Sequence, residues 1–245
     1  MIRTAYDRDF CRPITDETMV RLYGLREAYG LDVPFIRYYA DEEGGLLSLM
    51  DGIAMFSPAS DAVTEEWIAF LQMMPDVRCI HCSGRVGEAL VSRISGHLRT
   101  GVVLKLALAV PCVTTESKIV RDPYLPKVYS LLSRCFDTLP ALDAWYPDVS
   151  HRVRHGCCML ACIEEEDRIV STAMTVAQAG DYAVLGQVAT DPDYRRRGYA
   201  YACLSDLISR WQGDRLYIVP ANEVARKLYE ALGFSQNDTW AELEL

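Results

Sequence analysis

The stretch YAVLGQVATDPDYRRRGYAYACLSDLISRW, residues 182–211, decides the fold because it joins a strand, a short arginine-rich loop and a helix without interruption. Its first nine residues, 182–190, are apolar and rich in β-formers, which predicts a buried strand. The following DPD, residues 191–193, cannot continue a central strand. Beyond Gly198, apolar residues recur at helical spacing as far as Trp211, which predicts a helix.

The loop of this stretch has the properties of a phosphate site. It lies at a predicted helix N-terminus, where free backbone N–H groups and the helix dipole favour an anion. Gly198 and Ala200 are small enough for a diphosphate to reach the backbone, and residues 195–197 add three arginine charges. Neither a Gly-x-x-x-x-Gly-Lys-Ser/Thr loop nor a Gly-x-Gly-x-x-Gly turn is present, which excludes two other phosphate-binding motifs.

The chain after the helix continues the same pattern. Residues 215–219 (RLYIV) predict a second strand, and a right-handed parallel crossover is expected between the two strands. A helix over 224–232 is then predicted to end at Gly233, the residue type that helices prefer after their last turn.

Two motifs in this region resemble those of the GNAT superfamily of acyl-CoA-dependent N-acyltransferases. Residues 195–200 match the pattern Gln/Arg, x, x, Gly, x, Gly/Ala, and residues 222–234 match the Asn, Ala, Tyr, Leu-Gly-Phe pattern that follows the family's fifth strand. The resemblance covers about residues 118–245. It implies an α/β fold of the α+β type, with a mixed sheet formed by an antiparallel hairpin, a third strand and a parallel crossover.

The resemblance also implies a set of site residues. Backbone groups of Val188, Ala189 and Thr190 would bind the pantetheine arm of acetyl-CoA, with the Val188 N–H facing the thioester oxygen, and Tyr229 would protonate the departing thiolate. The diphosphate would be bound by Arg195, Arg196, Arg197, Gly198, Tyr199 and Ala200.

Two of these roles have alternatives. Asn222 is placed as a natural helix cap and, in the family, often contacts the cofactor, so both interpretations stay open. Tyr229 is read either as the proton donor or as an amphipathic rim tyrosine with its hydroxyl in water.

The general base is not identified. Many relatives carry a glutamate on the fourth strand, but residues 182–190 contain no carboxylate. His155 and water-mediated deprotonation are the candidates considered. Cys79 and Cys82 have the spacing of a redox or zinc motif, but no second pair completes four ligands, so no metal is expected.

Composition limits the function classes. Lys+Arg number 25 and Asp+Glu 34, a net charge of −9, divided as 11 and 15 through Thr115 and 14 and 19 after it. No part of the chain is basic, which argues against nucleic-acid binding and favours a cationic amine as partner. No apolar run approaches the roughly 18 residues of a membrane helix. Nine cysteines without a signal-peptide core predict reduced thiols in the cytoplasm.

The N-terminal half has its own alternation of elements. Helices are predicted over 16–29, 64–74 and 87–94, the first capped by Thr15 or Asp16, and strands over 34–40, 46–56, 77–82 and 101–110, with a kink at Gly52 in the second strand. This order is close to that of the C-terminal half, but no phosphate loop precedes the helix at 64. We therefore expect a degenerate GNAT-like domain without cofactor over 1–112 and the catalytic domain over 113–245, with a linker at 111–123.

The C-terminal domain is predicted to open with a short strand at 118–120 and an amphipathic helix through Val128 to Phe136. A shorter helical piece at 141–146 is expected between Pro140 and Pro147, and then a hairpin of strands over 156–163 and 168–177.

The sequence thus predicts an N-acetyltransferase that transfers acetyl from acetyl-CoA to a primary amine of a small molecule or peptide, within a ternary complex. The alternative is a non-catalytic acyl-CoA-binding or protein-interaction module on the same fold. The acceptor, the acyl length and the oligomeric state are left undetermined by the sequence.

Overall fold

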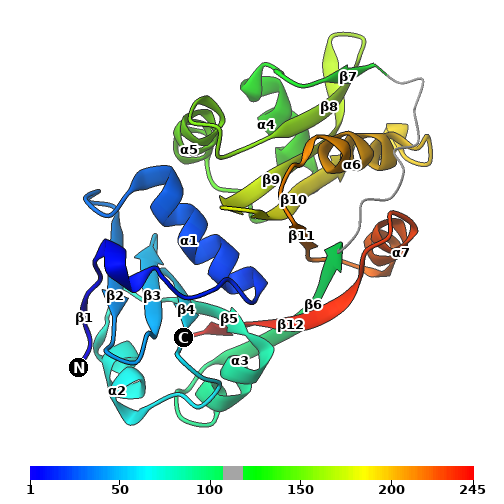
Figure 1. Cartoon of the computed structure of the whole chain (residues 1–245). Helices are drawn as coiled ribbons and strands as arrows, with labels where there is room; N and C mark the ends of the chain where they lie inside the picture. The colour runs from blue at the N-terminus through cyan, green and yellow to red at the C-terminus, as the bar shows by residue number, and fades with distance from the viewer. Residues whose placement is uncertain (107–117) are drawn as a thin grey trace. The chain divides into compact units, whose positions relative to one another are not determined.

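The computed structural model describes residues 1–106 and 118–245, which form two compact units. One unit comprises Met1–Val103 with Gln236–Leu245, and the other comprises Leu104–Ser235. The expected boundary at 112/113 and the linker residues up to 117 lie outside the described residues, so the proposed division stays a prediction. Each unit is a mixed α/β structure, as expected (Figure 1). No helix among the described residues is long and apolar enough to cross a membrane.

The second unit, Leu104–Ser235, contains the stretch that decides the fold. Its elements are β7 (Ile119–Val120), α4 (Leu125–Cys135), α5 (Leu142–Arg154), β8 (Leu160–Glu165), β9 (Arg168–Ala179), β10 (Tyr182–Thr190), η2 (Pro192–Tyr194), α6 (Tyr199–Arg210), β11 (Arg215–Ile218) and α7 (Glu223–Ala231). Strands β7 to β10 pair antiparallel in chain order, and β10 pairs parallel with β11. The hairpin, third strand and parallel crossover predicted from the sequence are therefore confirmed.

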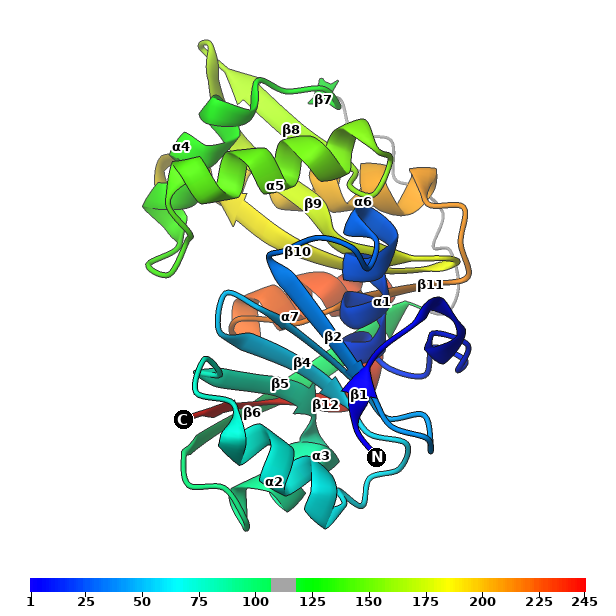
Figure 2. The ribbon, with the colours of Figure 1, turned by 90° about the vertical axis from the view of Figure 1, so that its left-hand side faces the viewer.

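Helices cover both faces of this sheet. Helices α4 and α5 lie on one face and α6 on the other (Figure 2). Leu131, Leu132, Trp145 and Val149 of the first pair pack on strand residues that include Met174.

The second helix of this unit is longer than expected. Helix α5 runs through Pro147 and ends at Arg154, so the prediction of a short piece ending before Pro147 is wrong. A proline at this point removes one intrahelical hydrogen bond. Trp145 and Val149, buried on either side of it, anchor the helix to the core and outweigh that loss.

The first unit has the same order of strand pairing. Its elements are β1 (Arg3–Thr4), η1 (Asp7–Asp9), α1 (Glu17–Tyr29), β2 (Ile36–Ala40), β3 (Leu46–Met50), β4 (Ile53–Ser57), α2 (Glu65–Met73), β5 (Cys79–Ser83), α3 (Gly84–Val91), most of β6 (His97–Leu106) and most of β12 (Ser235–Glu244). Strands β1 to β4 pair antiparallel in order, and β4 pairs parallel with β5 across α2. The topology repeats that of β7 to β11, which is what a degenerate copy requires; the descent itself stays a prediction.

One expected strand is in fact a hairpin. Residues 46–56 were expected to form a single kinked strand, but β3 and β4 pair antiparallel with Met50 opposite Ile53. Asp51 and Gly52 form the two-residue turn, with φ of 49° and 77°. Positive φ at both central residues is the geometry that matches the twist of a tight hairpin. The Asp-Gly pair was the signal for this turn.

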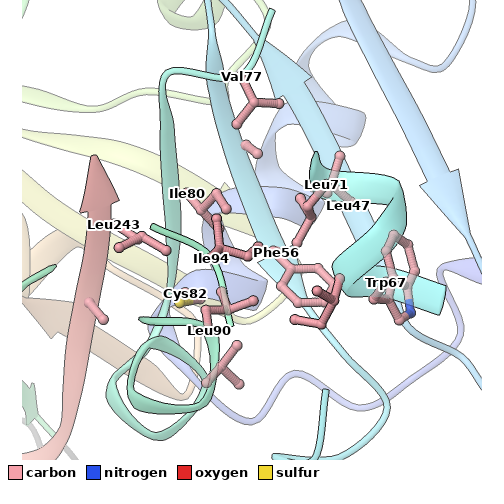
Figure 3. Close-up of a cluster of buried hydrophobic side chains, with 14 of the residues drawn as sticks. Leu47, Phe56, Trp67, Leu71, Val77, Ile80, Cys82, Leu90, Ile94 and Leu243 are labelled. Carbon is pink, nitrogen blue, oxygen red and sulfur yellow. The ribbon is translucent and has the colours of Figure 1, made fainter. Parts of the chain in front are cut away.

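The last strand of the chain was not predicted from the sequence. Strand β12 pairs antiparallel with β5, with Ala241 opposite Cys82 and Leu243 opposite Ile80. Ala241 and Leu243 are fully buried in the core of the first unit, beside Leu90 and Cys82 (Figure 3). The C-terminal residues, expected in the domain 113–245, thus complete the sheet of the N-terminal unit.

Candidate active site

The site begins where two parallel strands of the second unit stop pairing. The register of β10 and β11 runs from Tyr182 and Arg215 to Leu185 and Ile218. Strand β11 ends there, whereas β10 continues for five more residues to Thr190. Among the described residues, the edge of β10 that faced β11 has no strand partner along 186–190 and can offer backbone groups to an extended ligand. The Ala189 and Thr190 carbonyls already accept hydrogen bonds from the Ser171 hydroxyl and Arg195 Nε. Val188, Ala189 and Thr190 all lie in this open segment.

A β-bulge interrupts β10 in the same segment. Gly186 pairs with Met174 and Ala189 with Thr172, so two residues of β10 stand opposite one of β9. Gln187, inside the bulge, has φ of 46°. A bulge turns the following side chains and peptide groups out of the regular ladder. Val188 lies in this bulge and is not paired with a residue of β9.

The phosphate loop follows directly. Gly198 caps α6 in the left-handed conformation, with φ of 79° and no side chain to accept the first N–H groups of the helix. No atom lies within 4 Å of a Cβ built on it, so its backbone conformation, rather than lack of space, favours glycine here. Arg195, Arg196 and Arg197 are all exposed around it. The loop therefore combines a helix start without a side-chain cap and positive charge, two properties that favour an anion. The diphosphate site itself stays a prediction.

A buried carboxylate fixes the junction between β10 and this loop. Asp191 accepts hydrogen bonds from Arg134 at 2.8 Å and Arg168 at 3.3 Å, and its other oxygen accepts from the Asp193 backbone N–H at 3.2 Å. Helix α4 and strand β9 are thus tied to the start of the loop. From the sequence, Asp191 was expected only to end the strand. Its ion pairs with Arg134 and Arg168 were not predicted.

Tyr229 lies on α7 with its side chain buried, only 5% exposed. Burial raises the pKa of its hydroxyl to about 12, so the phenol keeps its proton throughout the physiological range. The burial argues against the interpretation of Tyr229 as a rim residue with its hydroxyl in water. Its ring packs against Phe234, with centroids 6.4 Å apart.

Asn222 caps the same helix. Its Oδ1 accepts a hydrogen bond from the Ala225 N–H at 2.9 Å, which confirms the capping interpretation. The side-chain NH₂ group is not used by the cap, so a contact with the cofactor remains a prediction.

The candidate base His155 and the two glutamates at the end of β8 contact other side chains. Glu165 accepts a hydrogen bond from the Tyr199 hydroxyl at 2.8 Å, and Glu164 is paired with Lys127. His155 is exposed at the end of α5, stacked on His151 with ring centroids 4.1 Å apart. None of these contacts links a side chain to Val188 or Tyr229, and the base stays unassigned.

Four cysteines of the described residues are buried thiols: Cys82, Cys158, Cys162 and Cys203. Burial raises the pKa of Cys162 to about 12 and of Cys158 to about 11. Within residues 1–106 and 118–245, no group of three or more His, Cys, Asp or Glu side chains is arranged to hold a metal ion.

Comparison with known proteins agrees with this geometry. Residues 125–234 match the model of the acetyltransferase (GNAT) family. The [ribosomal protein bS18]-alanine N-acetyltransferase of Haemophilus ducreyi is 34% identical over 77 residues, a match that covers 29% of this chain and 52% of that enzyme. The chain thus spans about half the length of this curated relative.

Solved structures resemble the chain over nearly all of its length. A Drosophila protein has a TM-score of 0.69 at 15% identity, covering 100% of this chain and 98% of its own. A GCN5-related N-acetyltransferase from Sphaerobacter thermophilus has a TM-score of 0.62 at 14% identity, covering 100% and 95%. A tandem GNAT protein from the clavulanic acid pathway has a TM-score of 0.60 at 14% identity, covering 91% and 87%. At these identities the likeness concerns the fold alone.

The open edge of β10, the uncapped α6 and the family match fall on the same segment of the chain. Residues 125–234 are therefore similar to the acetyltransferase (GNAT) family.

Proposed function

We propose that the chain is an N-acetyltransferase that transfers the acetyl group of acetyl-CoA to a primary amine within a ternary complex. The observation that carries the proposal is the open segment of β10 leading directly into the uncapped N-terminus of α6. An extended chain with a diphosphate at one end suits this succession of groups. The family match over 125–234 supports the same donor.

The donor would be held in two parts. The diphosphate accepts hydrogen bonds from the first N–H groups of α6, with Arg195, Arg196 and Arg197 neutralising its charge. The pantetheine arm adds to the free edge of β10 at Val188, Ala189 and Thr190, in the manner of an extra strand. Tyr199 and Ala200 belong to the first turn of α6, and Asn222 offers its amide from the start of α7.

The reaction is an acyl transfer without a covalent enzyme intermediate. The lone pair of a neutral amine attacks the thioester carbon, and the Val188 N–H donates to the developing oxyanion. The C–S bond then breaks and its electron pair stays on sulfur as a thiolate. Tyr229 keeps its proton and donates a hydrogen bond to that thiolate, which then takes its proton from water.

The raised pKa of Tyr229 determines how its hydroxyl acts on the thiolate. A phenol of pKa about 12 is a weaker acid than a thiol, whose pKa is about 8.5. Complete transfer is therefore uphill, and the main contribution is a hydrogen bond that strengthens as negative charge gathers on sulfur. The amine loses its proton through water, because strand β10 carries no carboxylate.

The acceptor is proposed as a cationic amine before deprotonation, a choice that the net charge of −9 supports. Small-molecule amines and peptide α-amines both fit this description. The ribosomal-protein acetyltransferase among the relatives makes an N-terminal alanine peptide a sensible member of any test panel. The buried thiols Cys82, Cys158, Cys162 and Cys203 support a reducing, cytoplasmic compartment.

The test is CoA release from acetyl-CoA with a panel of polyamines, amino acids and peptides. Turnover with at least one amine is expected. Binding of acetyl-CoA without turnover for any amine would instead favour a non-catalytic acyl-CoA-binding module, the alternative that the missing carboxylate supports.

A further inference from the structure

Gln187 has a backbone conformation that needs support. It lies in the bulge of β10 with φ of 46°, in the left-handed region. A residue with a Cβ atom is strained there, and glutamine is not among the types that tolerate it well. Such a conformation persists only where the surroundings hold it.

The support comes from a buried indole. The Nε1–H of Trp145 on α5 donates a hydrogen bond to Gln187 Oε1 at 3.2 Å. Trp145 is only 3% exposed, belongs to the core formed by α4, α5 and the strands, and packs against Tyr129 with ring centroids 5.4 Å apart. The indole N–H of Trp145 donates one hydrogen bond. If Gln187 moved away, this buried donor would be left unsatisfied.

The far side of the bulge is held as well. The Ser171 hydroxyl donates to the Ala189 carbonyl at 3.1 Å and contacts the Thr190 hydroxyl at 2.9 Å. Val188 lies between these two anchored points. The direction of its N–H is therefore determined by whether Gln187 stays in the left-handed conformation.

We propose that Trp145 is a positioning residue for acyl transfer: through its hydrogen bond to Gln187 it holds the bulge and thereby directs the Val188 N–H at the thioester carbonyl. The inference rests on the proposed function, since it assigns a ligand to that N–H. Trp145 itself does not touch the reacting atoms.

This role predicts selectivity between two ligands. Acetyl-CoA has the thioester carbonyl that Val188 would bind, whereas free CoA has none. Loss of the Trp145 hydrogen bond should weaken acetyl-CoA roughly fivefold, the effect of one net hydrogen bond, and leave CoA affinity unchanged. A purely structural defect would weaken both ligands alike.

The test uses acetyl-CoA labelled with ¹³C at the carbonyl, whose bound resonance reports the hydrogen bond without any acceptor amine. Trp145→Phe keeps the ring and removes the N–H. Trp67→Phe is the matched control, because Trp67 is equally buried in the other unit and donates its Nε1–H to Asp41 at 2.5 Å. The resonance of bound label should move toward its position in free acetyl-CoA in Trp145→Phe, and stay in place in Trp67→Phe.

A second set of variants changes Gln187 and leaves Trp145 unchanged in the core. Gln187→Leu should reproduce the Trp145→Phe shift. Gln187→Gly should retain most of the wild-type resonance, because glycine adopts positive φ without strain. Adding Trp145→Phe to Gln187→Gly should then change nothing further, since the two residues act through one contact.

The outcomes separate the two proposals. If the wild type binds no acetyl-CoA, the proposed function fails and this inference with it. If the variants bind acetyl-CoA with an unchanged carbonyl resonance, or lose CoA affinity to the same extent, only the positioning role of Trp145 is overturned.

Discussion

The two units contain the same pair of diverging parallel strands, yet the helices that follow begin differently. After β10, helix α6 starts at Gly198 with no side-chain cap and three exposed arginines before it. After β4, helix α2 starts at Thr64, whose hydroxyl accepts the Trp67 N–H, and carries Glu65 and Glu66 in its first turn. The N-terminus of α6 therefore favours an anion. At the N-terminus of α2, the Trp67 N–H already donates to Thr64, and the two glutamates repel an anion.

We therefore expect that topology alone does not decide cofactor binding. The pairing order of β1 to β5 repeats that of β7 to β11. A few residues at each helix start should decide whether a diphosphate binds within this shared arrangement of strands.

Gly198→Asp should abolish the stabilisation of the protein by acetyl-CoA. A ligand bound only to the native state stabilises it by about 2.7 kcal/mol at a hundred times its dissociation constant, and the aspartate places a negative charge where the diphosphate would lie. Thermal unfolding with and without acetyl-CoA measures the shift. Gly198→Ala separates the strain at φ of 79° from the charge and should lose only part of it.

A change to aspartate in the loop before α2 of the other unit is the internal control. Ser60→Asp, in the exposed loop that follows β4, should leave the acetyl-CoA shift intact. Loss of the shift in Ser60→Asp, or its retention in Gly198→Asp, would reverse the comparison between the two units.

Tyr229→Phe should lower turnover by about 10- to 100-fold at unchanged acetyl-CoA affinity, since a hydrogen bond to a charged group contributes about 1.5–3 kcal/mol. The substitution keeps the ring that packs on Phe234 and removes only the hydroxyl. Steady-state turnover and cofactor affinity are to be measured side by side with an accepted amine. Turnover within about threefold of wild type, with chemistry rate-limiting, would mean that another group assists the thiolate.

Leu243→Ala should destabilise the N-terminal unit by about 2–5 kcal/mol, because a fully buried side chain of β12 is removed from its core. Denaturant unfolding followed by hydrogen exchange assigns the loss to a unit. Leu245→Ala is the matched control: that residue is 48% exposed and should change stability by less than about 0.5 kcal/mol. Equal effects of both variants would show that β12 is not part of that core.

The pH dependence of stability should also differ between the units. His81 in the first unit is buried, with Nε2 3.0 Å from Glu17 and Nδ1 3.4 Å from Glu242, and Trp240 stacks on it. Burial and the nearby Arg21 lower the pKa of His81, whereas Glu17 and Glu242 raise it. The two carboxylates outweigh the other effects, so the pKa is raised. Arg21 and His81 outweigh the burial of Glu17 and lower its pKa to about 2.

The sign follows from these directions. A raised histidine pKa contributes stability that is complete below the unfolded value of about 6.5 and is lost as pH rises through the folded pKa. The contribution of Glu17 is present above about pH 4.5 and is lost as pH falls toward 2. Unfolding of the first unit should thus become easier as pH rises above about 6.5, and His81→Gln should remove that slope. A slope unchanged in His81→Gln would exclude the imidazolium as its source.

The sequence predicted the C-terminal unit better than the N-terminal one, for physical reasons. The bounds of β10 agree with the predicted strand at both ends because Asp181 and Asp191 flank a segment rich in β-formers. Strand β12 was missed because SQNDTWAELEL has only two core residues, Ala241 and Leu243, and its partner strand is far away in the chain. Long-range pairing of this kind leaves little local signal.

Part of the candidate site could likewise be predicted from the sequence and part could not. The small residues and arginines of the phosphate loop were visible in the sequence because the chemistry there is carried by consecutive residues. The contact between Trp145 and Gln187 and the ion pairs of Asp191 were not, because they join residues 23 to 57 positions apart. Only the fold brings them together.

A crystal structure of the protein grown with acetyl-CoA tests the central claim most directly. The account predicts one cofactor per chain, with its diphosphate at the start of α6 around Gly198 and its pantetheine arm along residues 186–190, and none beside residues 57–64. A cofactor bound at residues 57–64, or one whose diphosphate lies away from α6, would contradict it.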